Sequence, residues 1–226
     1  MTDSSLFETV LASTVHDMKN SLSLLLSQLD SISERLEQDT ENRESVSDLR
    51  YQANRINVSL MELLTLYKLE KKQIGVQINE VIVADFLMDC IAAHSLLAEN
   101  KRIQLDMDCD DSLIWFFDPD LVAIALNNII GNCLRYSESK VQVSAHTEDR
   151  KLFIRIDDDG QGYPDSMLVT PEQLGKKINY NTGSTGLGLF FAATIAQNHQ
   201  RQERQGRIQL NNDGDLGGGT FQITLP

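Results

Sequence analysis

The hydrophobic pattern of this chain changes its period once, near Gly75, and that change divides the fold into two parts. Before Gly75, apolar residues recur three, four or seven positions apart along two stretches, which is typical of amphipathic helices. The first stretch carries Leu6, Val10, Leu11, Met18, Leu22, Leu25, Leu29, Ile32 and Leu36. The second carries Val46, Leu49, Ala53, Ile56, Leu60, Leu63 and Leu64. A short polar segment at 38–43 separates them, so residues 1–72 are predicted to form a helical hairpin.

A helical hairpin buries only one face of each helix, and its remaining apolar residues need a partner. Pairing of two copies into a four-helix bundle provides that partner. Packing of the hairpin against the rest of its own chain is the alternative. Burial of the remaining apolar residues favours the homodimer, and much of our expectation of it comes from the family resemblance given below.

Beyond Gly75 the pattern switches to short strands that alternate with helices, which predicts an α+β chain whose second domain is residues 73–226. The domain is predicted to be an α/β sandwich, with one mixed sheet and helices on one face. Strands are expected at 76–78, 102–107, 113–117, 141–145, 152–156, 207–210 and 220–225, and helices at 83–100, 118–135 and 187–198. Residues 163–185 lack a strong period and are expected to form a long loop that acts as a lid.

Three further features of the second domain are local. Asp118 and Pro119 suit the cap and the first position of a helix. The polar segment 200–205 is expected to be a loop, and the glycines at 217–219 a turn.

Charge and composition exclude several classes of protein. The net charge is −13, which argues against broad binding of nucleic acid or anionic membranes. No apolar run approaches the ~20 residues of a membrane-spanning helix, and the N-terminus lacks the pattern of a signal peptide. Cys90, Cys109 and Cys133 have no metal-type spacing, which is typical of reduced thiols in a cytoplasmic protein.

Two glycine-containing segments in the last third of the chain are what a nucleotide site needs. Asp158, Gly160 and Gly162 form an Asp-x-Gly-x-Gly segment, and Thr185-Gly186-Leu187-Gly188 opens an apolar helix. Glycines let backbone N–H groups approach phosphate oxygens, and a helix N-terminus favours negative charge. A carboxylate at the end of a strand can accept a hydrogen bond from the exocyclic amine of adenine. Each segment alone is a weak signal, because the same residue types occur in ordinary surface turns and at ordinary helix starts.

A pair of asparagines lies on the predicted helix 118–135. Asn128 and Asn132 are four residues apart and share a face. Their carboxamide oxygens are suitable ligands for Mg²⁺, and Arg135 and Tyr136 follow where they could contact phosphate and base or ribose. A polar helix edge is an equally good interpretation of the pair alone.

His16 lies on the first predicted helix, in the segment His16-Asp17-Met18-Lys19-Asn20. A lone histidine on a helix is usually structural. Here Asp17 could accept the Nδ1 proton and leave Nε2 free as a nucleophile. Asn20 lies one turn further on the same face, where it could orient a water molecule.

These segments occur in an order that resembles the sensor histidine kinases of bacterial two-component systems over essentially the whole chain. In that resemblance, residues 1–72 are similar to the dimerisation and histidine-phosphotransfer hairpin. Residues 73–226 are similar to a catalytic ATP-binding domain of the Bergerat type, the nucleotide fold shared with gyrase and Hsp90.

The resemblance implies a role for each segment. His16 would be the phosphoacceptor, Asp17 its acid–base partner and Asn20 the residue that orients water during dephosphorylation. The N box would hold Asn128, Asn132, Arg135 and Tyr136, with Asn132 as the Mg²⁺ ligand. Asp158, Gly160 and Gly162 would be the first glycine box, with Asp158 on adenine, and Thr185, Gly186, Leu187 and Gly188 would belong to the second.

The function that follows is an ATP-dependent protein-histidine kinase, which phosphorylates His16 and passes the phosphoryl group to an aspartate of a response regulator. A member that acts mainly as a phosphatase of its regulator is one alternative, and a non-enzymatic phosphotransfer or scaffold dimer that no longer binds nucleotide is another. A gyrase-like ATPase would leave the His16 hairpin unexplained. Only fifteen residues precede His16, so a separate sensor protein would supply the signal, or the chain is the core of a longer protein.

Four features depart from the pattern of the family. Ser21 stands where a proline usually follows the histidine segment, and Ser184 stands where the second glycine box usually has glycine. No Phe-x-x-Phe segment occurs between the glycine boxes, and residues 200–205 are an insert.

Overall fold

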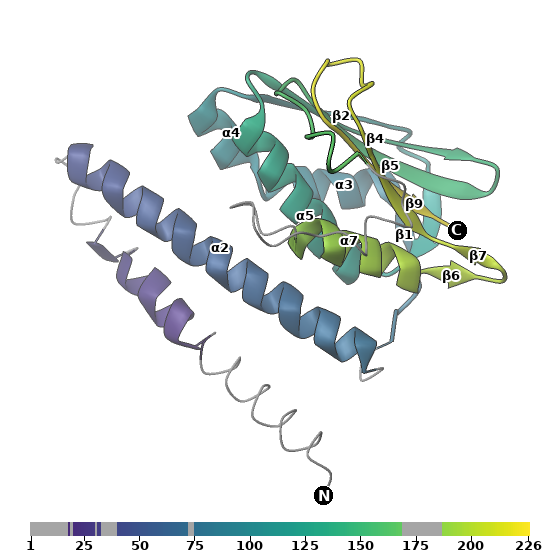
Figure 1. Ribbon diagram of the computed structural model, residues 1–226, viewed down its shortest axis with the longest axis horizontal. Helices are drawn as coiled ribbons and strands as arrows, with labels where there is room; N and C mark the ends of the chain where they lie inside the picture. Colours follow the sequence, from purple (N-terminus) through teal and green to yellow (C-terminus); the bar gives the residue numbers. More distant parts are fainter. Residues whose placement is uncertain (1–17, 19, 30, 33–39, 72–74, 169–186) are drawn as a thin grey trace, which may run out of the picture. The chain divides into compact units, whose positions relative to one another are not determined.

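The computed structural model describes residues 18, 20–29, 31–32, 40–71, 75–168 and 187–226 (Figure 1). The chain divides into two compact units, residues 1–74 and 75–226. Each unit is described separately below.

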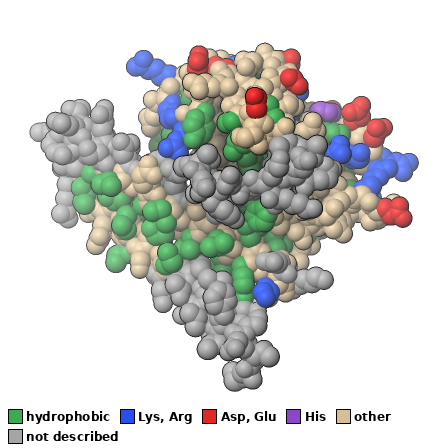
Figure 2. Space-filling view, viewed as in Figure 1, with side chains coloured by type: hydrophobic (Ala, Val, Ile, Leu, Met, Phe, Trp, Pro, Cys, Tyr) green, Lys and Arg blue, Asp and Glu red, His purple; other side chains and the backbone are tan. Residues whose placement is uncertain are grey.

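The described residues of the first unit are mainly helical, and residues 1–17, 19, 30 and 33–39 of the predicted first helix and turn lie outside them. Residues 20–29 are helical, and α2 (Thr40–Glu70) follows. Helix α2 begins inside the segment that was predicted to be a turn, residues 38–43, so the predicted turn extends too far. Leu29, Ala53, Leu60 and Leu66 are buried, and other hydrophobic side chains remain visible along α2 (Figure 2). A search of the described residues finds no helix with the length and apolar character to cross a membrane.

The second unit is built on a five-stranded sheet with the order β2-β4-β5-β9-β8. Strand β2 runs parallel to β4 and the other neighbours are antiparallel, so the predicted mixed sheet is confirmed. The strands are β2 (Gln104–Cys109), β4 (Lys140–Glu148), β5 (Lys151–Asp158), β8 (Arg207–Asn211) and β9 (Thr220–Leu225).

Helices cover one face of this sheet (Figure 1). They are α3 (Val83–Ala92), α4 (Ser95–Lys101), α5 (Pro119–Tyr136) and α7 (Leu187–Asn198). The period-two pattern of β5 explains which face they cover, because Leu152, Ile154 and Ile156 are fully buried while the residues between them point to the other side. The sites predicted on α5 and at the start of α7 therefore belong to one layer, above the sheet.

The buried side chain of His199 forms hydrogen bonds with both the start of α5 and the end of α7. Asp118 caps α5 as predicted, since its Oδ1 accepts from the N–H of Leu121 at 3.0 Å. His199 Nε2 accepts from the N–H of Asp118 at 3.0 Å, and its Nδ1 lies 2.8 Å from the carbonyl oxygen of Ile195. Because a carbonyl only accepts, Nδ1 must carry the proton. Burial lowers the pKa of His199, which keeps this neutral form in place.

Two element predictions are wrong. The first strand is β1 (Asn79–Ile82) rather than 76–78, and it pairs with β3 (Ile114–Phe117) in a separate two-stranded sheet. The helix predicted at 83–100 is two helices, because the chain turns at His94, whose N–H bonds back to the carbonyl of Ile91. The apolar period continues through this turn, so periodicity alone did not reveal the break.

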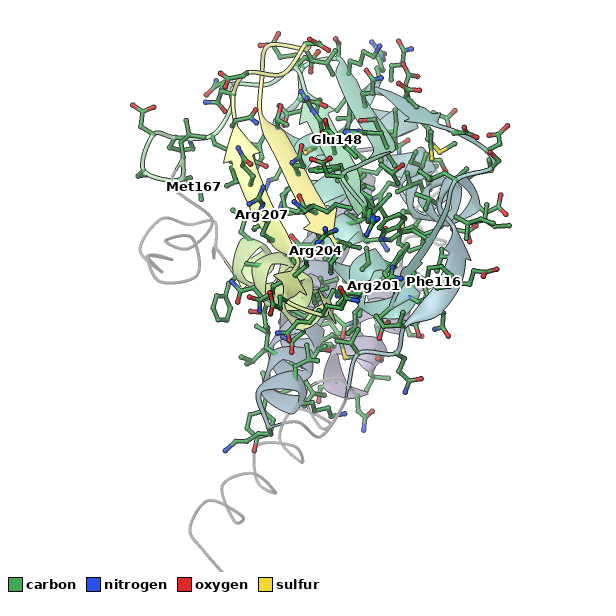
Figure 3. The ribbon with its side chains drawn as sticks, turned by 90° about the vertical axis from the view of Figure 1, so that its right-hand side faces the viewer. Phe116, Glu148, Met167, Arg201, Arg204 and Arg207 are labelled. Atoms are coloured by element: carbon green, nitrogen blue, oxygen red, sulfur yellow. The ribbon has the colours of Figure 1, made fainter. Side chains whose placement is uncertain are left out.

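The insert at 200–205 is a small hairpin rather than a loop. Strands β6 (Gln200–Arg201) and β7 (Arg204–Gln205) pair with each other, and the N–H of Gly206 closes the base on the carbonyl of His199 at 2.9 Å. Arg201 and Arg204 project from this hairpin, next to Arg207 at the start of β8 (Figure 3). The Arg204 guanidinium donates to the carbonyl of Asp149 in the β4–β5 turn at 3.1 Å.

Candidate functional site

The asparagine pair on α5 is close to the start of α7. Asn132 Nδ2 donates to Asn128 Oδ1 at 3.0 Å, so the two carboxamides lie on one face as predicted. A Cβ atom on Gly188 would lie 2.3 Å from Asn128 Oδ1, so the first turn of α7 packs directly against this carboxamide. The N-terminus of α7 and the asparagine pair therefore form one polar corner, which suits an anion with its counterion.

The donor set in this corner fits Mg²⁺ better than a tightly caged metal. Among the described residues, no group of three or more His, Cys, Asp or Glu side chains gathers that could hold a metal ion. Asn132 is exposed, and its Oδ1 is not used in the bond to Asn128. Mg²⁺ is commonly bound by one or two protein oxygens together with waters and substrate phosphates, so a single carboxamide is a sufficient protein ligand.

Asp158 lies buried at the end of β5, at the edge of the same layer. Its Oδ1 accepts from the N–H of Gly160 at 2.9 Å and from that of Gly219 at 3.2 Å. Its main chain pairs with Gly219 and Gly218 through bonds of 2.9 Å and 3.1 Å. Within the described part of the chain, main-chain N–H groups reach only Oδ1, which leaves Oδ2 to face another donor.

The thiol of Cys133 on α5 lies against this carboxylate. Burial raises the pKa of Cys133 well above its usual range, and the negative charge of Asp158 together with the hydrogen bond to it raises the pKa further. The thiol therefore stays protonated beside Asp158. Cys90, Cys109 and Cys133 are all free, as the sequence predicted.

The glycines of the first glycine segment are required by close packing. A Cβ atom on Gly160 would lie 2.4 Å from the carbonyl oxygen of Tyr136, so the glycine segment contacts the end of α5. A Cβ atom on Gly218 would lie 2.4 Å from the carbonyl oxygen of Asp158. Gly162 has φ +75°, a conformation that side chains with a Cβ rarely adopt.

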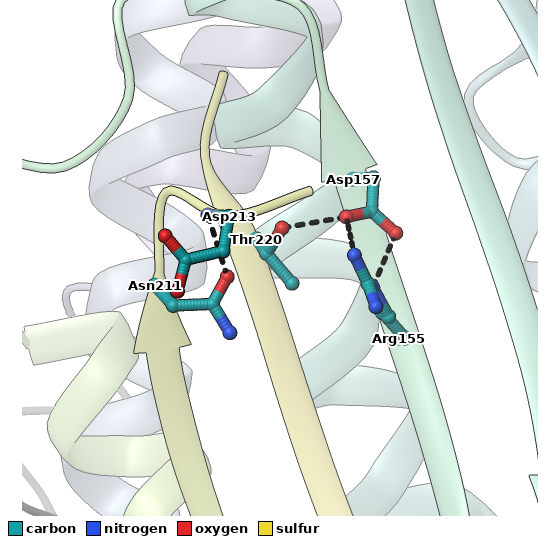
Figure 4. A network of polar contacts seen from close by, with 5 residues as sticks. All are labelled: Arg155, Asp157, Asn211, Asp213 and Thr220. Atoms are coloured by element: carbon teal, nitrogen blue, oxygen red, sulfur yellow. Dashed lines mark hydrogen bonds and ion pairs between the residues drawn. The ribbon is translucent and has the colours of Figure 1, made fainter. Parts of the chain in front are cut away.

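The three consecutive carboxylates in this segment have separate roles. Asp157 points to the open face of the sheet, where its two oxygens accept from Arg155 Nε and Nη2 at 2.7 Å each (Figure 4). The hydroxyl of Thr220 donates to Asp157 Oδ1 at 2.5 Å. Only Asp158 lies on the helix side, next to the glycines.

Asp159 holds the connection between α5 and β4. Its carboxylate accepts from the N–H groups of Glu138, Ser139 and Lys140 at 2.9–3.0 Å, and from the hydroxyl of Ser139 at 2.5 Å. Burial alone would raise the pKa of Asp159, but the hydrogen bonds from Ser139, Lys140 and Glu138 outweigh it and lower the pKa to about 2. Asp159 therefore fixes the chain directly after Tyr136.

We expect Asp159→Ala to lower the free energy of unfolding at pH 7 by about 1–2 kcal/mol, the usual cost of removing an acceptor of several main-chain N–H groups. Because the folded-state pKa lies below the value of ~3.9 in an unfolded chain, this stabilisation is present above pH ~4 and is lost as the pH falls toward about 2. Urea unfolding at several pH values measures the difference between wild type and variant. Glu203→Ala, at an exposed carboxylate, is the control and should show no such difference; a difference between wild type and Asp159→Ala that stays constant down to pH 2 would contradict the assignment.

Arg135 and Tyr136 lie at the end of α5, and both are exposed. The Arg135 guanidinium lies 5.7 Å from the centre of the Tyr136 ring, within the range of a cation–π contact. They are close to Gly160, because Gly160 packs on the carbonyl of Tyr136.

The structure thus brings together the predicted residues of the second unit: Asn128, Asn132, Arg135, Tyr136, Asp158, Gly160, Gly162, Leu187 and Gly188. Thr185 and Gly186 lie outside the described residues, as do His16 and Asp17. Asn20 is described as an exposed residue of the first unit.

Sequence reasoning missed two parts of this region. The turn lies at 214–217, closed by the N–H of Gly217 on the carbonyl of Gly214, and Gly218 and Gly219 instead pack directly on Asp158. The register of β9 against β5 pairs Thr220 with Asp157, and this places Gly219 beside Asp158. Asn212, which bonds to Tyr163, was missed because no local pattern marks it.

Comparisons with known proteins agree with this geometry. Residues 117–226 match the family model described as histidine kinase-, DNA gyrase B- and HSP90-like ATPase. The sensor histidine kinase CssS of Bacillus subtilis is 26% identical over 223 residues, which cover 96% of this chain and 46% of CssS. The sensor protein kinase WalK of Staphylococcus aureus is 28% identical over 227 residues, which cover 95% of this chain and 52% of WalK. The chain thus spans about half the length of these relatives.

Solved structures show the same fold. The histidine kinase AdeS of Acinetobacter baumannii superposes with a TM-score of 0.62 at 20% identity, over 93% of this chain and 96% of AdeS. Full-length ShkA in complex with AMPPNP superposes with a TM-score of 0.66 at 20% identity, over 96% of this chain and 45% of ShkA. Residues 117–226 thus match the model of the histidine kinase-, DNA gyrase B- and HSP90-like ATPase family, and nearly the whole chain is similar to sensor histidine kinases.

Proposed function

We propose that the protein is an ATP-dependent protein-histidine kinase that phosphorylates His16 and passes the phosphoryl group to an aspartate of a response regulator. The observation that carries this proposal is the assembly of a buried carboxylate, Asp158, with the Asn128–Asn132 pair and the N-terminus of α7 in one layer. The relatives named above, which are sensor histidine kinases, support it over nearly the full length of this chain.

In this proposal Asp158 and the polar corner each recognise a different part of ATP. Asp158 Oδ2 accepts from the exocyclic amine of adenine, which separates adenine from guanine. The N-terminus of α7 and the residues before it hold the phosphates. Mg²⁺ on Asn132 neutralises phosphate charge, which matters in a chain of net charge −13.

The transfer step would use His16 as the nucleophile. Its Nε2 attacks the γ-phosphorus in line, a nitrogen–phosphorus bond forms, and the bond to the β–γ bridging oxygen breaks so that ADP leaves. Asp17 holds the Nδ1 proton and stabilises the positive charge on the imidazole. Positioning and charge neutralisation supply most of the catalysis in such transfers.

Incubation of the wild type with γ-labelled ATP and Mg²⁺ tests the proposal. A phosphohistidine is labile in acid and stable in alkali, so the protein-bound label should have both properties and should require Mg²⁺. An acid-stable label, or none over several hours in the presence of bound nucleotide, would refute the kinase proposal.

We also propose that the hairpin forms a homodimer through a four-helix bundle. Three large apolar residues on α2 are spaced seven apart and are about half exposed: Leu49 at 58%, Ile56 at 52% and Leu63 at 46%. Met18, Leu25 and Ile32 repeat the same spacing on the first helix and are 43–45% exposed. A seven-residue repeat of apolar side chains is the pattern by which one helix packs along another. Two such stripes on one hairpin support pairing with a second copy.

We expect Ile56→Lys to convert the dimer into a monomer, because a charge in the centre of the stripe cannot be buried without a partner. Light scattering after size exclusion, at micromolar protein, measures the mass. Leu96→Lys adds the same charge at a position on α4 that is 69% exposed and should leave the dimer intact. A dimeric Ile56→Lys protein would contradict the proposed interface.

A second activity is suggested by Asn20, an exposed residue four positions after His16 in the sequence. We propose that it orients a water molecule for dephosphorylation of the response regulator, in the cytoplasm where receiver domains act. Asn20→Ala should lose the dephosphorylation of the regulator at least about tenfold while autophosphorylation is retained. Equal turnover of regulator phosphate with wild type and variant would dismiss this role.

A further inference from the structure

The Asn212 side chain, in the β8–β9 connection, forms hydrogen bonds with the end of the glycine segment beside Asp158. Asn212 Oδ1 accepts from the N–H of Tyr163 at 2.8 Å, and Asn212 Nδ2 donates to the carbonyl of Tyr163 at 2.9 Å. One carboxamide thus satisfies both main-chain groups of a residue 49 positions away in the chain. Such a two-point contact fixes the direction in which the Tyr163 side chain leaves the backbone.

The surrounding glycines show how closely this contact is packed. A Cβ atom on Gly162 would lie 2.8 Å from Cγ of Asn212, so the carboxamide lies directly on the left-handed turn. A Cβ atom on Gly219 would lie 3.0 Å from Asp158 Oδ2 and 3.1 Å from Cε2 of Tyr163. The carboxylate and the edge of the tyrosine ring therefore converge on the same point beside Gly219.

The tyrosine also has the chemistry of a ligand contact. Its side chain is half-buried, and among the described residues its hydroxyl makes no hydrogen bond. Burial raises the pKa of Tyr163 well above its usual range, and the negative charge of Asp158 raises it further. The hydroxyl is therefore neutral at any physiological pH and keeps its proton to donate.

We infer that Tyr163 is a specificity-determining residue of the nucleobase pocket, and that Asn212 is the positioning residue that holds it beside Asp158. The inference rests on the proposed nucleotide site and goes beyond it. A planar ring held at a fixed distance from Asp158 Oδ2 supports a planar base so that its exocyclic amine meets the carboxylate. If the ring is released, the base can shift, and the site no longer separates a base with the amine from one without it.

Calorimetric titration of the full chain with Mg²⁺-ADP and with Mg²⁺-inosine diphosphate tests this. Hypoxanthine carries a carbonyl where adenine carries the amine, so the ratio of the two dissociation constants reports base reading and not phosphate binding. For the wild type we expect a preference for ADP of about 100-fold, because Asp158 is left unpaired by the wrong base. For Asn212→Ala and Tyr163→Leu we expect an affinity for ADP about tenfold lower and a preference reduced at least about fivefold.

Asn211→Ala is the matched control. Asn211 is the neighbouring residue with the same side chain, and its Oδ1 accepts from the N–H of Asp213 at 3.1 Å (Figure 4). This variant should keep the wild-type ratio. Tyr163→Phe keeps the ring and removes only the hydroxyl. It therefore distinguishes a hydrogen bond from the hydroxyl from packing of the ring against the base.

The outcomes distinguish a failure of the proposed function from a failure of this inference alone. A wild type that binds neither nucleotide refutes the proposed function, and this inference with it. Binding by the wild type with an unchanged ratio in Asn212→Ala, or an equal loss of both nucleotides, refutes the inference alone. If circular dichroism shows that Asn212→Ala is unfolded, Tyr163→Leu decides, and an unchanged ratio in that variant overturns the inference.

Discussion

The His16→Gln variant is expected to take up no acid-labile label from γ-labelled ATP, a loss limited only by the background of the assay. Glutamine is close in size to histidine, but its amide nitrogen has no available lone pair and cannot attack phosphorus. The asparagine pair, Asp158 and the start of α7 all belong to the second unit, residues 75–226, so the affinity for Mg²⁺-ADP should stay within twofold of wild type.

His146→Gln provides the control for this experiment. His146 is an exposed histidine of β4, where it stacks on Phe153 with ring centres 5.1 Å apart. The same substitution at this position should leave the label unchanged. Acid-labile label on His16→Gln at the wild-type level would place the acceptor elsewhere.

The Asp158→Asn variant is expected to bind Mg²⁺-ADP at least about 100-fold more weakly, which corresponds to about 2.7 kcal/mol. The asparagine oxygen can still accept from Gly160 and Gly219, so the local backbone is retained. Its amide NH₂ would replace Oδ2 and present a donor to the donor amine of adenine. Calorimetry measures the loss, and autophosphorylation should fall with it.

Asp157→Asn is the matched control, because the two residues are adjacent and the substitution is the same. Asp157 faces the open side of the sheet and holds Arg155 and Thr220, so its replacement should cost stability but leave the ADP affinity within twofold. An Asp158→Asn protein that binds as tightly as the wild type would rule out the assignment of Asp158 to adenine.

The parts of the fold that could be predicted from sequence are those with local causes. The cap at Asp118 depends on a contact with Leu121, three residues away, and Pro119 marks the same boundary. Helix α7 was predicted with its observed bounds because its apolar residues and its opening glycine are contiguous. The β4–β5 hairpin follows from two period-two strands around a short turn.

The parts that failed depend on contacts across long stretches of chain. The strand near 76–78 was misplaced because β1 is defined by its partner β3, and Asn79 pairs with Phe117. In the candidate site, Gly219 reaches Asp158 across 61 residues and Asn212 reaches Tyr163 across 49. No composition or period marks such pairs, so the sequence indicated Asp158 but neither its supporting glycine nor the residue that holds its neighbour.

The six-residue hairpin of β6 and β7 has a practical consequence for studying this protein. Its base is closed by the bond from Gly206 to His199, and its residues lie outside the five-stranded sheet, so the polypeptide there can be exchanged without disturbing a core strand. A tetracysteine or lanthanide-binding sequence grafted between Arg201 and Arg204 would carry a spectroscopic reporter on the nucleotide-binding unit. Paired with a dye on an exposed residue of α2, it would let energy transfer test whether this unit moves relative to the first unit during the proposed phosphorylation.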